Sequence, residues 1–199
     1  NPAIAAQKHC FSGEAYPGIP VYEKPKFFNG DQWEKHWDKD QYPLVLSTYK
    51  PILRSNYSGF FDHCNQVSPQ NFIYMNKNTA QQFGLKDKER VVLTSPDGVT
   101  AEGVLACDDG VAEMTVCVAH AYGHWSGGAE VREVDGKSLP VARRRGGGTA
   151  INRLIPVDPT RPGAVKALND YYAGAFCRSG IPVKVEQYRE MKPIGCPVM

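Results

Sequence analysis

The sequence predicts a mainly β domain, folded as a barrel or a sandwich. Between residues 43 and 126, several short apolar runs are separated by turn signals about a dozen residues apart. These runs do not alternate with long helical segments, as the strands of a parallel α/β sheet would. A chain of 199 residues can bury a real core, so one domain with extensions accounts for its length.

Six runs rich in β-branched and aliphatic residues predict the strands in chain order. Pro43 suits the first position of the first strand, where its missing N–H interrupts no ladder. Pro96-Asp97-Gly98 is a tight turn, so the strands on either side of it should form a hairpin. The strands are expected at residues 44–46, 72–75, 89–94, 99–106, 111–119 and 181–185.

Two short helices are predicted within the same part of the chain. Asn76 or Asn78 can cap a helix over residues 78–83, and Gly84 is placed for its left-handed exit. The other helix is expected over residues 164–171. Both are short, so strands should dominate the fold.

Residues 1–42 are expected to form an extended strap before a domain over residues 43–199. The strap is rich in proline, glycine and aromatic residues, and prolines at this density prevent long helices. One short helix is expected from Asp31, acting as its cap, to Trp37. This helix would place Trp33 and Trp37 on one face, where the two indoles need a partner surface.

Composition excludes several classes of function. A formal net charge of +2, with a single basic triplet at residues 143–145, is too small for a nucleic-acid-binding protein. No run approaches the roughly 20 apolar residues of a membrane span, so no direct membrane insertion is expected. The chain lacks an initiator Met and begins without the features of a signal peptide, so we interpret it as a fragment or a processed form.

The cysteines do not have the spacing of a metal site. No C-x-x-C pair occurs, so the sequence lacks the paired spacing of zinc and iron–sulfur sites. Cys107 and Cys117 lie in apolar runs and are interpreted as buried free thiols. A disulfide stays open for the others, which are Cys10, Cys64, Cys177 and Cys196.

Two polar clusters interrupt the first part of the β pattern, although each could be a solvated loop or ordinary packing. Residues 47–50 and 54–58 offer amides, hydroxyls and two cations that could cradle a phosphate or a heterocycle. Residues 120–125 contain two histidines four positions apart. Gly123 and the strand context argue against a metal site there and favour stacking or hydrogen bonding to a planar ligand.

Two further clusters follow. Asn152 stands among apolar residues, and its amide must be satisfied by backbone or by a ligand with paired donors and acceptors. Arg178 and Lys184 flank a turn that enters the last strand, where either cation could face phosphate or simply be solvated. The triplet at residues 146–148 is not a nucleotide fingerprint, because it lacks the G-x-G-x-x-G spacing.

The order and spacing of these clusters resemble the C-terminal domain of the dimethyl-sulfoxide-reductase family of molybdenum oxidoreductases. The resemblance covers about residues 15–188 and is greatest with the branch of tetrathionate reductases and respiratory arsenate reductases. The motifs that carry it are Pro43-Leu44-Val45-Leu46-Ser47-Thr48-x-Lys50, Ile73-Tyr74-Met75-Asn76-x-x-x-Ala80-x-x-Phe83-Gly84-Leu85, Ser95-Pro96-Asp97-Gly98, Gly123-His124-Trp125, Ala150-Ile151-Asn152-Arg153-Leu154 and Gly180-Ile181-Pro182-Val183-Lys184.

The resemblance implies a six-stranded double-psi β-barrel that binds one of two molybdopterin guanine dinucleotides. Loops at one rim of a closed barrel can bring distant residues together. Asn152 matches the asparagine that faces the pterin, and residues 54–56 replace the family's usual His-Thr-His, which removes the imidazoles but allows amide and hydroxyl contacts. By position, the cofactor-binding residues would be Ser47, Thr48, Lys50, Arg54, Ser55, Asn56, Gly123, His124, Trp125, Asn152, Arg178 and Lys184.

The resemblance also implies that the reacting centre belongs to a larger enzyme. In the family, molybdenum is bound by the cofactor's dithiolenes and often by a side chain of another domain, and an iron–sulfur cluster uses an N-terminal cysteine motif not found here. We therefore assign no catalytic residue and no metal ligand, and the fragment alone should be inactive. Expected partners are the N-terminal domains of the same polypeptide, an iron–sulfur electron-transfer protein and a membrane anchor subunit, in the periplasm.

Two other interpretations compete with this one. A free-standing double-psi barrel could be an adaptor for a protein or peptide, although the loop-rich ends at residues 1–42 and 127–199 look suited to lie against absent domains. An aspartate-decarboxylase-like enzyme would need a Gly-Ser self-cleavage site. The chain has only the reverse order, at Ser12-Gly13, Ser58-Gly59, Ser126-Gly127 and Ser179-Gly180.

Overall fold

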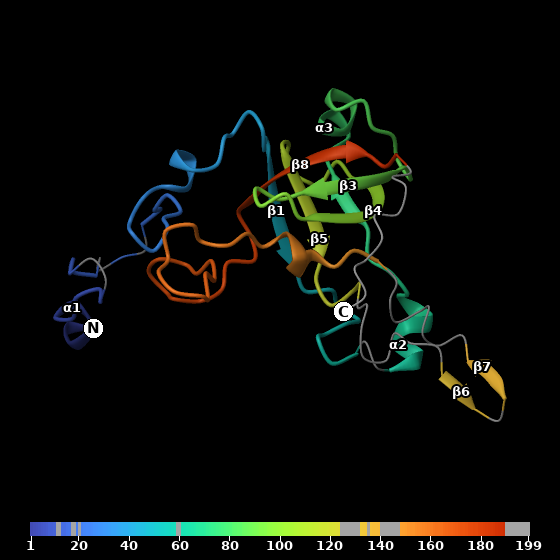
Figure 1. The fold of residues 1–199 in the computed structure, drawn as a ribbon, viewed down its shortest axis with the longest axis horizontal. Coiled ribbons are helices and arrows are strands. Elements are labelled where there is room, and N and C mark those ends of the chain that lie inside the picture. Colours follow the sequence, from blue (N-terminus) through green and yellow to red (C-terminus); the bar gives the residue numbers. More distant parts are fainter. Residues whose placement is uncertain are drawn as a thin grey trace.

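A closed barrel of six strands forms the centre of the computed structural model (Figure 1). Around the barrel the strands follow the order β1-β5-β2-β4-β3-β8. Their bounds are β1 Leu44–Tyr49, β2 Ile73–Met75, β3 Arg90–Thr94, β4 Thr100–Cys107, β5 Thr115–Ala119 and β8 Ile181–Gln187. The predicted β-barrel is therefore confirmed. The structure describes residues 1–10, 13–16, 19, 21–58, 61–123, 132–134, 136–139 and 148–189.

The barrel combines parallel and antiparallel pairs. β1 runs parallel to β5, and β2 runs parallel to β4. The β3–β4 hairpin, predicted from its turn, is antiparallel, as are the pairs of β8 with β1 and β3. Parallel neighbours require crossover connections, because no short turn can join them. This mixture is compatible with the predicted double-psi topology.

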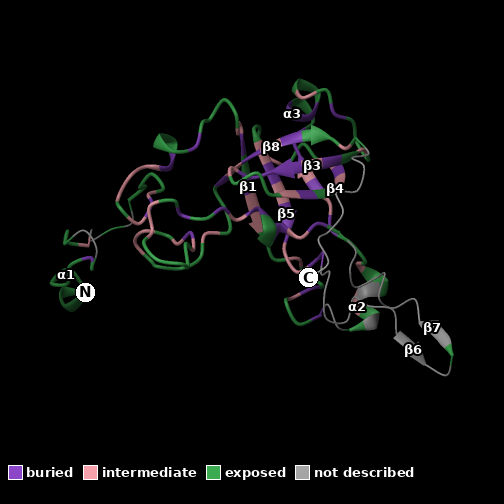
Figure 2. Cartoon of the chain, in the orientation of Figure 1, coloured by how far each residue is buried: buried purple, intermediate pink, exposed green. Residues whose placement is uncertain are grey.

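Buried and more exposed side chains alternate along the strands, because every second side chain points into the barrel. In β1, Leu44 and Leu46 are fully buried, whereas Val45 between them is exposed. In β8, Ile181 and Val183 are buried in the same way. Figure 2 shows much of the barrel coloured as buried. Period-two alternation of this kind fixes the strand register, since a slip of one residue would turn the apolar set outward.

Some strand limits differ from the sequence-based expectation. β1 continues to Tyr49 instead of ending at residue 46, because it pairs with β5 along its polar end. β5 begins only at Thr115, four residues later than predicted, because Val111 closes a turn onto Asp108 and Met114 has a φ of 55°. A residue with positive φ cannot continue an extended strand.

Helix α3 (Lys77–Gln82) confirms the predicted helix, with each end one residue earlier than expected. The Asn76 side chain accepts a hydrogen bond from the Asn78 main chain at 2.9 Å, and Gly84 has a φ of 67°. Both features satisfy backbone groups that a short helix leaves unpaired. The prediction missed α1 (Pro2–Ala5), α2 (Asp62–Val67), the strands β6 (Arg132–Val134) and β7 (Lys137–Leu139), and the 3-10 turn η3 (Ile151–Leu154).

The helix predicted over residues 164–171 is wrong. Isolated bridges pair Val157 with Ala167 and Asn169 with Phe176, so this stretch is extended. The Asp170 carboxylate then accepts main-chain hydrogen bonds that form a turn. An aspartate that bonds to nearby main-chain N–H groups favours a turn over a helix interior.

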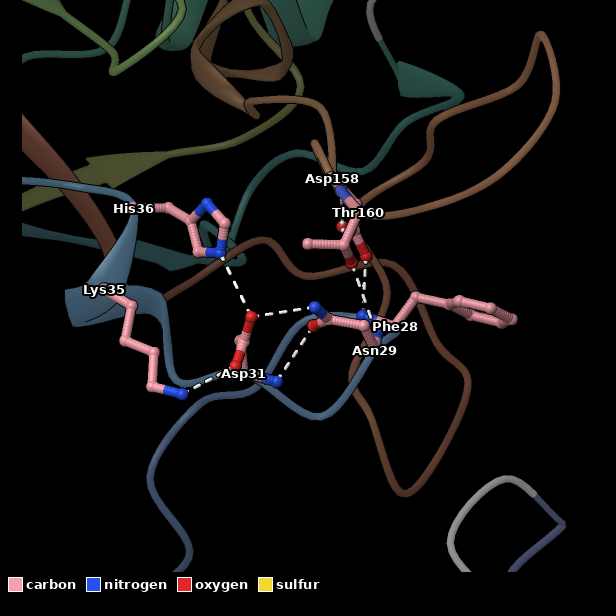
Figure 3. A network of polar contacts seen from close by, with 7 residues as sticks. All are labelled: Phe28, Asn29, Asp31, Lys35, His36, Asp158 and Thr160. Atoms are coloured by element: carbon pink, nitrogen blue, oxygen red, sulfur yellow. Dashed lines mark hydrogen bonds and ion pairs between the residues drawn. The ribbon is translucent and has the colours of Figure 1, made fainter.

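The strap forms a second small core instead of the predicted helix. Residues 31–37 contain only a 3-10 turn, η1 (Trp33–Lys35). Trp33 and Trp37 find their partner surface on Phe27 and Leu168, and all four are buried. Asp31 does not cap η1. Its carboxylate accepts hydrogen bonds from Lys35, Asn29 and His36, which together lower the Asp31 pKa to about 2 (Figure 3).

A buried carboxylate joins the strap to the later loop. Asp158, which is 1% exposed, accepts from the Phe28 main chain at 2.8 Å and from the Thr160 N–H and hydroxyl at 2.8 and 2.7 Å (Figure 3). The Asn29 main chain donates to the Thr160 hydroxyl at 3.2 Å. The strap is therefore fixed to residues 157–177, although a domain division at residues 42 and 43 stays a prediction.

Candidate functional site

Three strand ends meet at one rim of the barrel, where β1 and β5 end and β8 begins. The His120 N–H, just beyond β5, donates to the Tyr49 carbonyl at 3.1 Å. The Thr48 N–H donates to the Ser179 hydroxyl at 2.9 Å, just before β8. The rim therefore places the polar end of β1 beside the turn that contains Arg178.

A cleft opens beside this rim. Its volume is about 270 Å³, and no carboxylate belongs to the described residues that line it. Two carboxamides, an imidazole, a guanidinium and a tyrosine supply its polar side chains. The lining residues are Asn56, His120, Ala121, Tyr122, Gly123, Ala150, Ile151, Asn152 and Arg178.

Asn71 holds two walls of the cleft together. Its amide nitrogen donates to the Ala119 carbonyl at 2.6 Å and to the Thr149 carbonyl at 3.1 Å. Its amide oxygen accepts from the Thr149 N–H at 2.6 Å, and the side chain is buried. These bonds connect the end of β5 to the segment that leads into Asn152. The sequence analysis missed Asn71, for which the only signal was an asparagine immediately before a predicted strand.

Gly123 lets the same walls approach closely. Its φ is 70°, and a Cβ placed on it would lie 2.8 Å from the Ala150 Cα and still nearer to the Ala150 nitrogen. Any larger residue would combine a strained backbone with a clash. The glycine is therefore required by the geometry of the cleft.

Tyr122 lines the cleft and is supported from behind by Arg54. The Arg54 guanidinium lies 4.2 Å from the centre of the Tyr122 ring and donates to the Ser68 carbonyl at 2.6 Å. The hydroxyls of Tyr122 and Ser68 are 2.6 Å apart. Arg54, which is 2% exposed, thus contacts the tyrosine beneath the cleft instead of lining it.

Positive charge dominates the electrostatics of the cleft. Burial lowers the pKa of His120, and the charges of Arg178 and Lys50 lower it further. The Tyr49 backbone near the ring acts in the opposite direction. The imidazole is consequently neutral at neutral pH in the ligand-free cleft. The sequence analysis noted the cluster that contains His120 without selecting this residue as a contact.

The structure brings part of the predicted residue set together. Asn56, Gly123, Asn152 and Arg178 line one cleft, although they come from distant parts of the sequence. The remaining rim residues lie close by: Thr48 bonds to Ser179, Lys50 acts electrostatically on His120, and Ser47 pairs with Cys117.

Other predicted residues lie elsewhere. Lys184 pairs with Thr94 on the barrel wall and forms a 3.2 Å ion pair with Glu186, away from the cleft. The Ser55 main chain is bonded to the Ser58 hydroxyl in the loop that contains Arg54. His124 and Trp125 lie outside the described residues.

The thiols of the described residues are free. Cys107 and Cys117 are free, as predicted, but only partly buried, and this burial raises the pKa of both thiols. Cys10, Cys64 and Cys177 are free as well, whereas Cys196 lies outside the described residues. In the described ranges, no three His, Cys, Asp or Glu side chains gather as metal ligands, and no helix has the length and apolar character to span a membrane.

Comparison with known proteins places this geometry in context. The family model of the molydopterin dinucleotide binding domain matches residues 45–167. A tetrathionate reductase subunit of Salmonella typhimurium is 29% identical over 188 residues, which are 94% of this chain and 18% of that protein. A selenate reductase subunit of Mesobacillus selenatarsenatis is 24% identical over 190 residues, covering 86% of this chain and 17% of that protein.

A solved structure shares the fold. Acetylene hydratase from Pelobacter acetylenicus matches with a TM-score of 0.58 at 15% identity, over 85% of this chain and 21% of that one. The chain thus spans less than a fifth of the length of the two reductase subunits and about a fifth of the hydratase.

Proposed function

The chain belongs to the family of molybdopterin dinucleotide binding domains, as its resemblance to the dimethyl-sulfoxide-reductase family predicted, and we propose that its rim cleft binds a molybdopterin guanine dinucleotide. The observation that carries this proposal is the convergence of Asn56, Gly123, Asn152 and Arg178 on one cleft.

The chemistry of the lining suits that ligand. A pterin presents ring nitrogens, an amino group and a carbonyl, and carboxamides such as Asn56 and Asn152 offer both donors and acceptors to such an edge. Arg178 suits phosphate, because a guanidinium donates two parallel hydrogen bonds to an anion. The absence of a carboxylate among the described lining residues leaves this attraction unopposed.

The size of the cleft indicates that it holds only part of the ligand. Pockets that enclose a drug-sized molecule have volumes of about 300–1,000 Å³, and this cleft measures about 270 Å³. We therefore assign the pterin to the side of Asn152 and the phosphates to the side of Arg178 and Ser179. When bound, the cofactor would supply the redox chemistry, and the chain would supply binding and orientation.

We further propose that the complete protein is a catalytic subunit similar to tetrathionate reductase, with its iron–sulfur cluster in other domains. Exposed apolar side chains near the cleft support burial against such domains. Ile52, Leu53 and Tyr57 follow β1, and Phe61 and Val67 lie in or beside α2, all more than half exposed. Several exposed apolar side chains in one stretch of the chain are consistent with an interaction surface. The electron-transfer and anchor subunits and the periplasmic location belong to the same proposal.

Calorimetry on this chain tests the cofactor site, with GDP and extracted cofactor as probes. We expect measurable but weak binding, because much of the ligand would be buried by other domains; nanomolar affinity would show instead that this chain forms the whole clamp. Arg178→Ala should weaken binding about tenfold or more, since a hydrogen bond to a charged group contributes about 1.5–3 kcal/mol. Asn152→Ala should also weaken it.

Lys184→Ala provides the matched control, because the resemblance assigns Lys184 to the cofactor whereas the structure pairs it with Glu186. We expect this variant to bind as the unmodified chain does. If Lys184→Ala loses affinity while Arg178→Ala and Asn152→Ala do not, the cleft described above is not the cofactor site.

A further inference from the structure

His120 stands at the point where the cleft meets the barrel rim. It follows β5 directly, and its main chain is fixed to the Tyr49 carbonyl at 3.1 Å. His120 lines the same cleft as Arg178 and Asn152. The imidazole therefore borders the ligand space from a rigid position.

The ring can offer only one donor while it is neutral. A neutral imidazole has one N–H and one acceptor nitrogen, and it becomes a double donor only when protonated. The Tyr49 backbone near the ring favours its protonated form. Whichever nitrogen of a neutral ring carries the N–H, the other would present a lone pair to a phosphate oxygen. The ring must gain a proton before this nitrogen can donate to an anion.

Among the residues that the structure describes, the charged groups that act on the ring are of one sign. Arg178, from the turn before β8, and Lys50, from the end of β1, both oppose protonation of the ligand-free imidazole. The other polar side chains of the lining near it are the carboxamide of Asn56 and the phenol of Tyr122, and no described carboxylate lines the cleft. An anion that binds between these cations cancels their effect on the ring and attracts a proton to it.

We propose that His120 is an additional phosphate ligand of this cleft, and that it takes up one proton from solvent when the dinucleotide binds. This inference rests on the proposed function and adds to it a contact and a linkage. Proton uptake on binding means that the affinity for anions increases as the pH falls. It also means that the cleft releases its ligand more readily at alkaline pH.

The probe for this linkage is a pyrophosphate diester that carries a guanosine at each end. Its phosphates are diesters with fixed charge, so any pH dependence of binding between about pH 5 and 8 belongs to the protein. Calorimetry should show affinity about tenfold higher at the acid end, equivalent to about 1.4 kcal/mol. Nuclear magnetic resonance should show the ring of His120 titrating at higher pH with the probe than without it.

Two variants separate this effect from general acid sensitivity. His120→Gln keeps a side chain that can donate a hydrogen bond but cannot titrate, so its binding should be nearly independent of pH. His63→Gln, which replaces a histidine of α2 outside the cleft, should keep the full pH dependence. His120→Gln also identifies the His120 ring signals by their disappearance.

The outcomes distinguish this inference from the proposed function. Tight binding that does not vary with pH, or a pH dependence that survives in His120→Gln, overturns the role of His120 and leaves the cofactor site intact. A third outcome is that the probe does not bind but sulfate still moves the titration of His120 to higher pH. This result supports His120 as an anion ligand and overturns the proposed dinucleotide site. If neither probe nor sulfate moves the titration, both proposals fail.

Discussion

The side chain of Asn71 acts as a clamp that joins the two walls of the cleft. Replacing Asn71 with Asp changes the amide nitrogen, a hydrogen-bond donor, into an oxygen, which is an acceptor. The amide nitrogen now donates to the Ala119 and Thr149 carbonyls at 2.6 and 3.1 Å. In the Asn71→Asp variant, an oxygen would face those two carbonyl oxygens. The bond accepted from the Thr149 N–H at 2.6 Å would remain.

The magnitude follows from these contacts and from burial. Two lost hydrogen bonds cost about 1–3 kcal/mol, and leaving buried carbonyls unpaired adds to that cost. We therefore expect Asn71→Asp to lose about 2–4 kcal/mol of unfolding free energy at neutral pH. Burial and the facing carbonyls would raise the pKa of the introduced carboxyl in the folded state above the unfolded value of about 3.9.

The sign of the pH dependence follows from that shift. A carboxyl whose folded pKa is raised destabilises the fold progressively as the pH rises from the unfolded pKa to the folded one. Below this range the carboxyl is protonated, and its O–H can donate to one of the two carbonyls again. The loss caused by Asn71→Asp should consequently be smaller near pH 4 than at neutral pH.

Urea unfolding at the two pH values measures the effect. If the slope of the unfolding free energy against urea concentration is unchanged, the substitution has altered stability alone. Asn78→Asp is the matched control, because Asn78 is exposed and its amide bonds to the exposed Glu113. We expect this control to lose less than about 1 kcal/mol. If Asn71→Asp loses no more than Asn78→Asp, or loses more stability at acid pH, the clamp does not act as described.

Two further substitutions test the packing of the structure. Asp158→Ala removes the acceptor for the Phe28 main chain and for both donors of Thr160. Chemical denaturation should therefore show that the free energy of unfolding decreases by about 2–4 kcal/mol. A decrease no larger than that caused by replacing an exposed aspartate would mean that the strap is held by its aromatic core alone. Gly103→Ala would drive a methyl group into the Thr149 hydroxyl. The free energy of unfolding should therefore decrease by about 1–3 kcal/mol, and the midpoint temperature of thermal unfolding should fall. An unchanged midpoint temperature would contradict the close approach.

The elements that could be predicted from the sequence are those that local chemistry determines. Helix α3 has its cap at Asn76 and its exit at Gly84, and both lie within the helix's own neighbourhood. The β3–β4 hairpin is likewise specified by the turn at residues 96–98. The helix expected over residues 164–171 failed because its contacts are distant: Ala167 pairs with Val157 and Leu168 packs on the strap.

In the candidate site, too, local features could be predicted from the sequence and features that depend on distant contacts could not. Asn152 and Arg178 could be selected because polar groups in apolar or turn contexts are visible in the sequence. The structure places Lys184 on the barrel wall, because the register of β8, with Ile181 opposite Leu46, directs later residues away from the rim. Asn71 could not be selected, because its three hydrogen bonds reach 48 and 78 positions along the chain.

The position of β8 in the chain determines when the cleft can exist during synthesis. β1 pairs with both β5 and β8, and β8 also seals β3, so the cylinder stays open until residue 187 has left the ribosome. Before then, β1 and β3 expose unpaired edges, which is the condition under which nascent β proteins associate wrongly. Any ligand of the rim cleft can therefore be bound only after translation has passed the last strand.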